Sequence, residues 1–345
     1  MTKVFPSSSN MFVPSLDATD ALTIGFTRNV SDFAINRYTQ LKPVSKEIGY
    51  YTEINAEEAA RIVSSVLNDM VWHDGNDAPV GNENKEKFEF LQYRTKRYAK
   101  AYRFGYKAVG QAAFDVLMLH AKIYAQMMMT ARTQLAITAM QNHSATGVNT
   151  SAVSSISGVT GKWDLSTTAR NDIQRSIEYA VDTIFQVTLG VVKPDDLMLV
   201  MSPTTARSIS PVQEIRDHIK GSPDALSSIR GEMQLARFGL PDRLFGINVV
   251  VEDAVKVTNR KGATIARSYV ADADKPFICA RPGALVAPDI AGPSYSSCTL
   301  FALEDMTVET KDDPDNRRHQ GRITTDITAV LTAPSTMFIF QDALT

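Results

Sequence analysis

Cysteine, histidine and long apolar runs are scarce in this sequence, and each scarcity excludes a class of protein. The only two cysteines, Cys279 and Cys298, are far apart, whereas a zinc site or a disulfide framework needs closely spaced pairs. No segment approaches the roughly 18 apolar residues of a membrane span, and the N-terminal residues lack the basic-then-apolar order of a secretion signal. We therefore expect a soluble protein that has no metal, cofactor or membrane partner.

An excess of either charge is also missing. The 345 residues carry a formal net charge of −2 at pH 7, so the chain as a whole has no electrostatic attraction for nucleic acid or for an acidic membrane. A hydrophobic content of 44% and a charged content of 21% are typical of a folded globular protein. This length suffices for one large core or for a few smaller ones.

The parts of a catalytic site are scarce as well. A nucleophilic serine needs a base, usually a histidine, within hydrogen-bond reach, and the five histidines stand in unrelated segments. Ser202 stands in Met-Ser-Pro, outside the Gly-x-Ser-x-Gly setting of a hydrolase nucleophile. It follows an apolar strand predicted over 197–201, so Ser202 or Thr204 is predicted to cap the next helix. We expect that the protein is not an enzyme.

What the sequence does contain is a basic ribbon over residues 85–107. Eight Lys or Arg stand there against two Glu, and Tyr98, Tyr102, Phe104 and Tyr106 fall on alternate positions, which favours a long strand. Basic residues interleaved with aromatics suit nucleic-acid binding, through phosphate contacts and base stacking. The alternative is a ribbon that lies on a neighbouring acidic surface, which we favour because no nucleic-acid-binding module surrounds the stretch.

Residues 109–141 give the strongest helix signal in the chain. They hold no Pro, no Gly after Gly110, and many Ala, Leu, Met and Gln, which are good helix formers. At about 1.5 Å per residue such a helix spans roughly 50 Å. Because its polar side is narrow, we expect it to pack against several other elements.

The remaining elements mix helices and strands without a regular alternation. They are predicted as helices at 56–71 and 169–190, a Ser-, Thr- and Gly-rich surface loop at 143–169, a turn and a buried strand within 240–255, and strands at 299–310 and 322–332. Between the last two, the charged residues 312–321 match only the start of a calcium loop and are predicted to form a hairpin turn. This order of elements predicts the α+β class.

Several stretches, taken in order, carry a resemblance to a known family. EKFEFLQYRTKRYAKAYRFGYK (86–107) runs into AVGQAAFDVLMLHAKIYAQ (108–126), and KPDDLMLVMSPTTARSI (193–209), GLPDRLFGINVVVEDAV (239–255) and GRITTDITAVLTAPSTMFIF (321–340) follow. With an extended N-terminal arm they resemble the major capsid proteins of tailed bacteriophages, which have the Hong Kong 97-like coat fold. They look like that family's extended loop, spine helix, peripheral-domain strand and helix, axial-domain strand and closing peripheral-domain strand.

The resemblance implies a division of the chain. The expected parts are an N-terminal arm (1–45), an extended-loop region (46–107), the spine helix with the first part of the peripheral domain (108–235), the axial domain (236–295) and the closing strands of the peripheral domain (296–345). It also implies a shell of hexamers and pentamers around double-stranded DNA, found in the virion after synthesis in the bacterial cytoplasm. The further expected partners are a separate scaffolding protein, a portal protein, decoration proteins and the packaged DNA, which would be held non-specifically.

Seven charged residues are candidates for contacts between subunits. The resemblance implies that the basic loop overlaps a neighbouring subunit, where its positive charge would meet acidic side chains. The candidates are Arg94, Arg97, Lys100 and Arg103 on the ribbon and Asp312, Asp313 and Asp315 in the charged turn. An encapsulin-like nanocompartment shell protein is the main alternative function. A nucleic-acid-binding protein and a hydrolase that uses Ser202 are the weaker alternatives.

Overall fold

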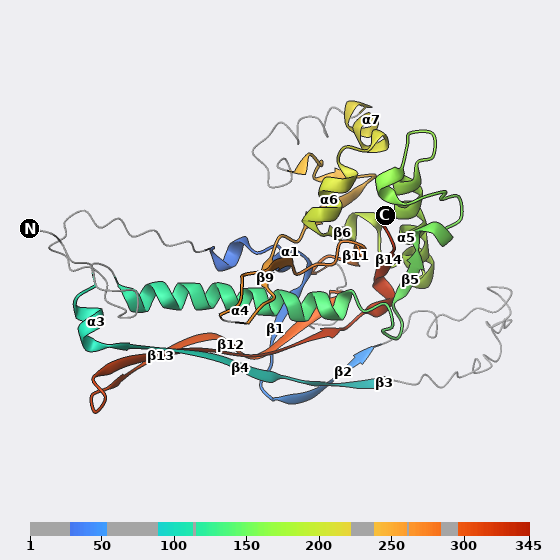
Figure 1. The fold of residues 1–345 in the computed structure, drawn as a ribbon. Helices are drawn as coiled ribbons and strands as arrows, with labels where there is room; N and C mark the ends of the chain where they lie inside the picture. The colour runs from blue at the N-terminus through green and yellow to red at the C-terminus, as the bar shows by residue number, and fades with distance from the viewer. Residues whose placement is uncertain (1–27, 54–88, 113–114, 222–237, 261, 284–295) are drawn as a thin grey trace, which may run out of the picture.

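The described part of the chain is built around two larger β-sheets with a long helix between them (Figure 1). The structure is a computed structural model that describes residues 28–53, 89–112, 115–221, 238–260, 262–283 and 296–345. The helix predicted at 56–71 and the first 27 residues of the predicted arm lie outside these ranges. The mixture of helices with largely antiparallel sheets confirms the α+β class. The division of the chain into five parts stays a prediction.

A six-stranded sheet forms the upper part of the molecule in Figure 1. Its strands lie in the order β5-β14-β11-β6-β8-β7. Their bounds are β5 Asn149–Ala152, β6 Leu197–Met201, β7 Arg243–Leu244, β8 Ile247–Val251, β11 Phe277–Ala280 and β14 Phe338–Gln341. The pairs β5–β14 and β6–β8 are parallel, and the other neighbours are antiparallel.

The central strand β6 is covered on both faces, which explains its apolar sequence. Leu199 and Met201 lie in a core shared with α5 (Asp172–Val187) and α6 (Pro203–Ile209), whereas Val200 lies in a second core with residues of the long helix. Successive side chains of a strand point to opposite faces, so a strand buried on both sides is apolar at every position. The strand predicted at 197–201 is confirmed.

A four-stranded sheet forms the lower part, in the order β1-β12-β13-β4. Its strands are β1 Gln40–Pro43, β12 Cys298–Asp313, β13 Arg318–Leu331 and β4 Lys96–Gly105. β12 and β13 form a long antiparallel hairpin, so the turn predicted at 312–321 is confirmed. β4 pairs with β13 and has no strand on its other side in the part of the chain that the structure describes.

The basic ribbon is extended from Glu89 to Gly105, as predicted, but it divides at Thr95, and its last two residues, Tyr106 and Lys107, begin α3 instead of continuing the strand. Before Thr95, β3 (Glu89–Arg94) pairs with β2 (Ile48–Glu53) in a separate two-stranded ribbon. After Thr95, β4 joins the four-stranded sheet. The division therefore places one end of the basic ribbon outside the sheet and the other end within it.

The long helix is shorter than predicted. The sequence predicts one helix over 109–141, but α3 (Tyr106–Gly110) ends early and α4 runs from Val116 to Met140. Asp115 marks the start of α4, because its side chain accepts a hydrogen bond from the amide of Met118 (2.9 Å) and caps the helix. The 25 residues of α4 span about 38 Å rather than 50 Å.

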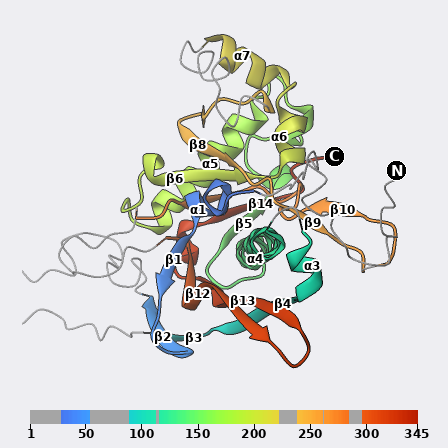
Figure 2. The same ribbon diagram turned by 90° about the vertical axis from the view of Figure 1, so that its left-hand side faces the viewer.

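The nearly all-apolar surface of α4 correctly predicted packing on several sides. Met129, Ala136 and Ile137 lie in the core beneath the six-stranded sheet, and the opposite side of α4 contacts β13 of the four-stranded sheet. Figure 2 looks along α4 and shows it enclosed between the two layers. Burial from two directions leaves room for few polar residues.

The Ser-, Thr- and Gly-rich segment at 143–169 lies largely at the surface, as predicted, but it is not a separate insert, because it also supplies a strand of the six-stranded sheet and several core side chains. β5 forms the edge of the six-stranded sheet, and the Trp163 side chain is fully buried, with its ring 4.9 Å from that of Phe340. Val153 and Ile156 are buried beside it. The composition signals turns, and a few apolar side chains anchor the segment on the core.

Two smaller elements complete the described fold. α7 (Gln213–Gly221) follows α6, and β9 (Val255–Val257) pairs with β10 (Arg267–Tyr269) in a ribbon that stands apart from both larger sheets (Figure 2). None of the described helices is both long and apolar enough to cross a membrane.

Candidate functional site

The aromatic side chains of β4 turn toward α4. Tyr102 is 5% exposed, and its ring lies 5.5 Å from that of Tyr124 on the helix. The same ring lies across Gly321, the residue directly opposite on β13, where a Cβ would come within 2.1 Å of it. Glycine is therefore required at 321, and Tyr102 is not available to stack on bases. This packing argues against a nucleic-acid site on that face.

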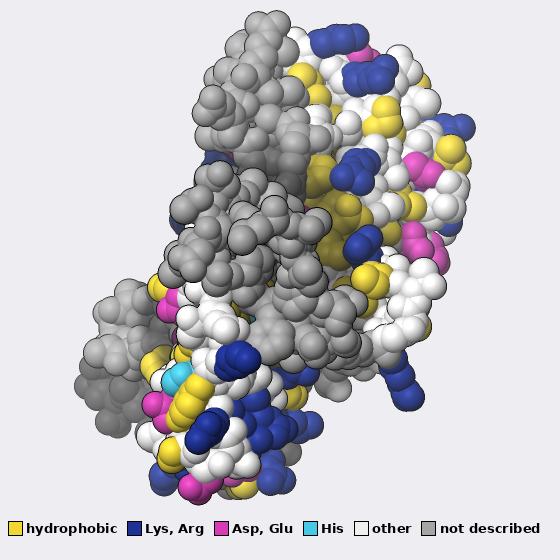
Figure 3. Space-filling model, turned by 60° about the vertical axis from the view of Figure 1, so that its left-hand side comes forward, with side chains coloured by type: hydrophobic (Ala, Val, Ile, Leu, Met, Phe, Trp, Pro, Cys, Tyr) yellow, Lys and Arg dark blue, Asp and Glu magenta, His cyan; other side chains and the backbone are white. Residues whose placement is uncertain are grey.

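The opposite face of the four-stranded sheet is charged. Directly opposed residues of an antiparallel pair share a face, so Arg97 lies beside Asp326, and Arg103 beside Gln320. On the neighbouring strands Arg322 Nε donates to Glu309 (2.6 Å), and this hydrogen bond lowers the pKa of Glu309. Figure 3 shows Lys and Arg side chains gathered over the lower part of the molecule, where these strands lie.

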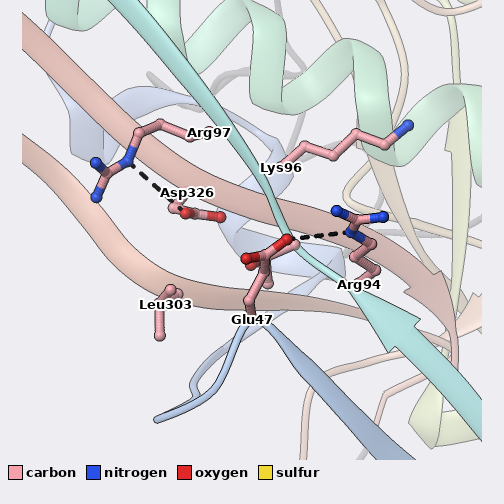
Figure 4. A pocket seen from close by; sticks show the side chains of 7 residues that line it. Glu47, Arg94, Lys96, Arg97, Leu303 and Asp326 are labelled. Atoms are coloured by element: carbon pink, nitrogen blue, oxygen red, sulfur yellow. Dashed lines mark hydrogen bonds and ion pairs between the residues drawn. The ribbon is translucent and has the colours of Figure 1, made fainter.

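The charged face is hollowed where β3 passes into β4 (Figure 4). A pocket of about 630 Å³ is lined by Glu47, Arg94, Thr95, Lys96, Arg97, Leu303 and Asp326. Arg94 Nε donates to Glu47 Oε1 (3.1 Å), and Arg97 Nη2 donates to Glu304 Oε2 (2.9 Å). Arg97 Nε also lies 3.8 Å from Asp326 Oδ2. Arg94 and Arg97 thus have carboxylate partners in their own chain.

Two buried polar atoms in this pocket have no partner. Asp326 and Thr95 are 6% and 2% exposed, yet neither Asp326 Oδ1 nor Thr95 Oγ1 has a hydrogen-bond partner among the described residues. Buried polar groups in proteins are usually paired. Both atoms are therefore unpaired polar groups buried in the wall of the pocket. Sequence analysis missed Asp326, because nothing in the apolar strand around it signals a pairing with residue 97.

The acidic turn at the end of the β12–β13 hairpin is paired within itself. Asp313 accepts hydrogen bonds from Asn316 Nδ2 (2.9 Å) and Arg318 Nε (2.8 Å), and these bonds lower the pKa of its carboxyl. Asp312 contacts the ring of His319. Asp315 is exposed at the tip.

The structure does not gather the seven candidates into one cluster. Arg103 lies at the end of β4 nearest the acidic turn, whereas Arg97 lies six residues away, about 20 Å along the strand. Among the described residues, no ion pair involves Lys100, Arg103 or Asp315. These three charges are the ones that remain available to another molecule.

Ser202 caps α6, as predicted. Its Oγ accepts a hydrogen bond from the amide of Thr204 (3.2 Å), and the residue is 1% exposed. None of the described histidines contacts this hydroxyl, so the geometry gives no support to a hydrolase. The described ranges also contain no group of three or more His, Cys, Asp or Glu that could hold a metal ion.

Solved structures share this arrangement of sheets and helices across nearly the whole chain. A phage-related protein from Bordetella bronchiseptica is 15% identical, with a TM-score of 0.59, and the match covers 92% of this chain and 93% of that one. The mature capsid of bacteriophage PhiM1 is 12% identical, with a TM-score of 0.55 and coverage of 99% and 91%. The chain has the phage coat fold. The capsid protein of cyanophage P-SCSP1u agrees, at 11% identity and a TM-score of 0.53, with coverage of 94% and 91%.

Sequence comparison alone does not find these relatives. No protein-family model matches the chain, and no curated protein matches it. The coat fold predicted from the order of the elements is confirmed by the structural similarity. At such low identity the likeness establishes the fold, and function has to be argued from the surfaces.

Proposed function

We propose that the chain is the major capsid protein of a tailed bacteriophage and that it assembles with itself into an icosahedral shell around double-stranded DNA. The observation that carries the proposal is the coat fold, which matches the PhiM1 mature capsid protein over 99% of this chain. The expected assembly contains hexamers and pentamers, in which one fold occupies slightly different positions. Its role is structural, and its site of action is the virion.

Exposed basic side chains of the edge strand β4 support a contact between subunits: Arg103 lies on the charged face of the four-stranded sheet, and Lys100 lies on the opposite face. Lys100 and Arg103 are exposed and have no ion partner in the described chain. In a closed assembly each subunit contacts its neighbours through both of the surface patches that form the interface. Lys100 and Arg103 would therefore meet acidic side chains of the next subunit, with Asp315 as the first candidate.

The other predicted contact residues would lie in this interface while they keep their ion pairs within their own chain. They are Arg94, Arg97, Asp312 and Asp313, each of which is paired within its chain. A scaffolding protein, a portal protein, decoration proteins and loosely held DNA remain the expected further partners.

The test is assembly of the full chain, followed by electron microscopy and light scattering. We expect closed shells of many subunits from the wild type. The double variant Lys100→Glu/Arg103→Glu should remain folded by circular dichroism but form few shells. The matched control Arg170→Glu/Arg216→Glu reverses two exposed charges elsewhere and should assemble normally. Normal shells from the first variant would contradict the contact.

The contents of particles from the native source decide between the proposed function and its alternatives. Double-stranded DNA inside the shell agrees with a phage capsid. A cargo enzyme inside it would instead indicate an encapsulin-like compartment. A chain that never assembles and binds DNA in a salt-sensitive manner would indicate a nucleic-acid-binding protein.

A further inference from the structure

A basic hairpin projects from the body of the molecule beside α4. It comprises residues 255–260 and 262–269, including β9 and β10, and these residues include Lys256, Arg260 and Arg267 but no Asp or Glu. None of the ion pairs between described residues involves Lys256, Arg260 or Arg267. The hairpin is therefore a concentrated positive charge with no acidic partner in the described chain.

The basic hairpin is also unusually apolar for an exposed element. Val257 and Ile265 are each 60% exposed. Val257 stands directly opposite Arg267, so an aliphatic side chain and a guanidinium share one face of the ribbon. An isolated two-stranded ribbon is at best marginally stable in water. Both features suit an element that is covered by a partner.

A patch on α5 and the loop after it has the complementary character. Glu178, Asp182 and Phe185 recur at helical spacing along the exposed side of α5, and Leu189 and Val191 follow in the loop after it. Phe185 is 47% exposed, Leu189 51% and Val191 68%. No ion pair between described residues involves Glu178 or Asp182. We call these five residues the α5 patch.

The backbone just after α5, next to the α5 patch, is strained. Leu189 has a φ of +50°, and Gly190 follows with +77°. Glycine adopts this left-handed region without cost, whereas a bulky residue does so rarely. The Gly190 amide donates to the carbonyl of Phe185 (2.8 Å), which closes the turn. A strained leucine that faces solvent is an observation that points to a function at this position.

We propose that the basic hairpin of one copy of this chain docks on the α5 patch of a second copy. The hairpin offers aliphatic side chains with positive charge, and the patch offers aromatic and aliphatic side chains with negative charge. β9 and β10 lie beside α4 (Figure 2), whereas α5 packs on the face of the six-stranded sheet away from α4, so the two surfaces are separate within one chain. A contact between two different surfaces repeats head to tail, and it gives a ring when the rotation between copies closes and an open filament when it does not. The inference rests on the proposed function and names a contact within its capsomers.

A second copy fits the basic hairpin better than nucleic acid does. DNA would use the charges of Arg260 and Arg267 but would leave Val257 and Ile265 in water. A protein surface that is both apolar and acidic uses all four side chains, and the α5 patch is such a surface within the same chain. Charge complementarity would also fix the direction of the contact.

Cysteine trapping in the full chain tests the contact. Val257→Cys and Leu189→Cys are made in separate chains, which are then mixed and oxidised; Cys279 and Cys298 are buried and do not compete. Docking raises the effective concentration of the two thiols, so the mixed dimer should form about tenfold faster than from the control mixture of Val257→Cys with Thr310→Cys. Neither variant alone should give rapid dimers, because the contact joins two different surfaces.

Charge reversal gives an independent readout. Asp182→Arg should slow the trapping by about tenfold, and the compensating change Arg260→Asp/Arg267→Asp in the partner chain should restore it.

The possible outcomes separate the contact from the proposed function. If the wild-type chain associates by light scattering but the mixed dimer of the cysteine variants forms no faster than in the control mixture, the contact is overturned and the proposed function stands. Trapping at the expected rate in a chain that forms only open filaments would support the contact and contradict the shell. The contact would also be overturned if the cysteine variants are not trapped and the variant Arg260→Asp/Arg267→Asp loses binding to DNA, because the hairpin would then be a DNA-binding element.

Discussion

At the scale of single residues, Glu252 is a carboxyl group buried inside the subunit. It lies at the end of β8 with no exposed surface. The Tyr38 hydroxyl donates to Glu252 Oε2 (2.7 Å) and the Ala254 amide to Oε1 (3.1 Å). Burial raises the pKa of Glu252, and the two hydrogen bonds partly offset the rise. The pair ties the segment around α1 (Ile35–Tyr38) to the six-stranded sheet.

We expect Tyr38→Phe to destabilise the chain more at high pH than at low pH. A carboxyl group whose pKa is raised by folding contributes stability that is present at low pH and is lost as the pH rises through its folded pKa. Without the Tyr38 hydroxyl the ionised form loses a donor, so the pKa of Glu252 rises further. Urea unfolding from about pH 4.5 to pH ~8 should show a loss in free energy of unfolding that grows to about 1–3 kcal/mol.

The control for this prediction removes the titrating group. In a Glu252→Gln background, the effect of Tyr38→Phe should no longer change with pH. A loss that is constant across the pH range in the wild-type background would show that Glu252 is not the group responsible.

At the scale of elements, α5 depends on a residue from another helix for its N-terminal cap. Asn171, which stands at the cap position, has a φ of +51° and makes no capping bond. Glu214 from α7 supplies it, because its carboxylate accepts hydrogen bonds from the amides of Ile173 (3.1 Å) and Gln174 (2.7 Å). The first amides of a helix have no partner within the helix and attract negative charge. The two helices are therefore coupled.

Glu214→Ala should lower the free energy of unfolding by about 1.5–3 kcal/mol, the range for hydrogen bonds to a charged group. Gln213→Ala changes the exposed neighbouring residue on α7 and should shift it by no more than about 0.5 kcal/mol. Chemical denaturation of both variants measures the difference. Equal effects of the two substitutions would contradict the cap.

At the scale of the whole molecule, the charges of β4 divide into those that hold the subunit together and those that remain for its neighbours. Arg97 is bonded to Glu304 and lies near the buried Asp326. Arg103 is exposed on the same strand and pairs with no acid in the described chain. Mutating the two positions should therefore affect different properties.

Arg97→Glu should destabilise the isolated subunit by roughly 1 kcal/mol, since it removes an exposed ion pair and adds repulsion beside Asp326. Arg103→Glu should leave the subunit's free energy of unfolding unchanged and reduce the yield of assembled particles. Denaturation of dissociated subunits and light scattering of assembling ones separate the two effects. An equal loss of subunit stability in both variants would show that the division is wrong.

Local patterns in the sequence are sufficient to predict many of the elements of this fold. The apolar run Leu197–Met201 predicts a strand, the Ser-Pro step after it predicts a capped helix, and the repeat of isoleucines in α5 predicts its buried face. Each of these signals comes from residues that are neighbours in the sequence. Because propensity and periodicity act over such short distances, these elements and the α+β class follow from the amino-acid sequence alone.

Which distant residues meet depends instead on the tertiary fold. The partners of Arg97 are Glu304 and Asp326, both about two hundred residues away in the sequence, and Trp163 is buried because Phe340 packs on it from β14. Strand pairing and core packing depend on long-range register, which no local pattern contains. For the same reason, the pocket beside β4 and the placement of the basic hairpin and the α5 patch exist only in the folded chain.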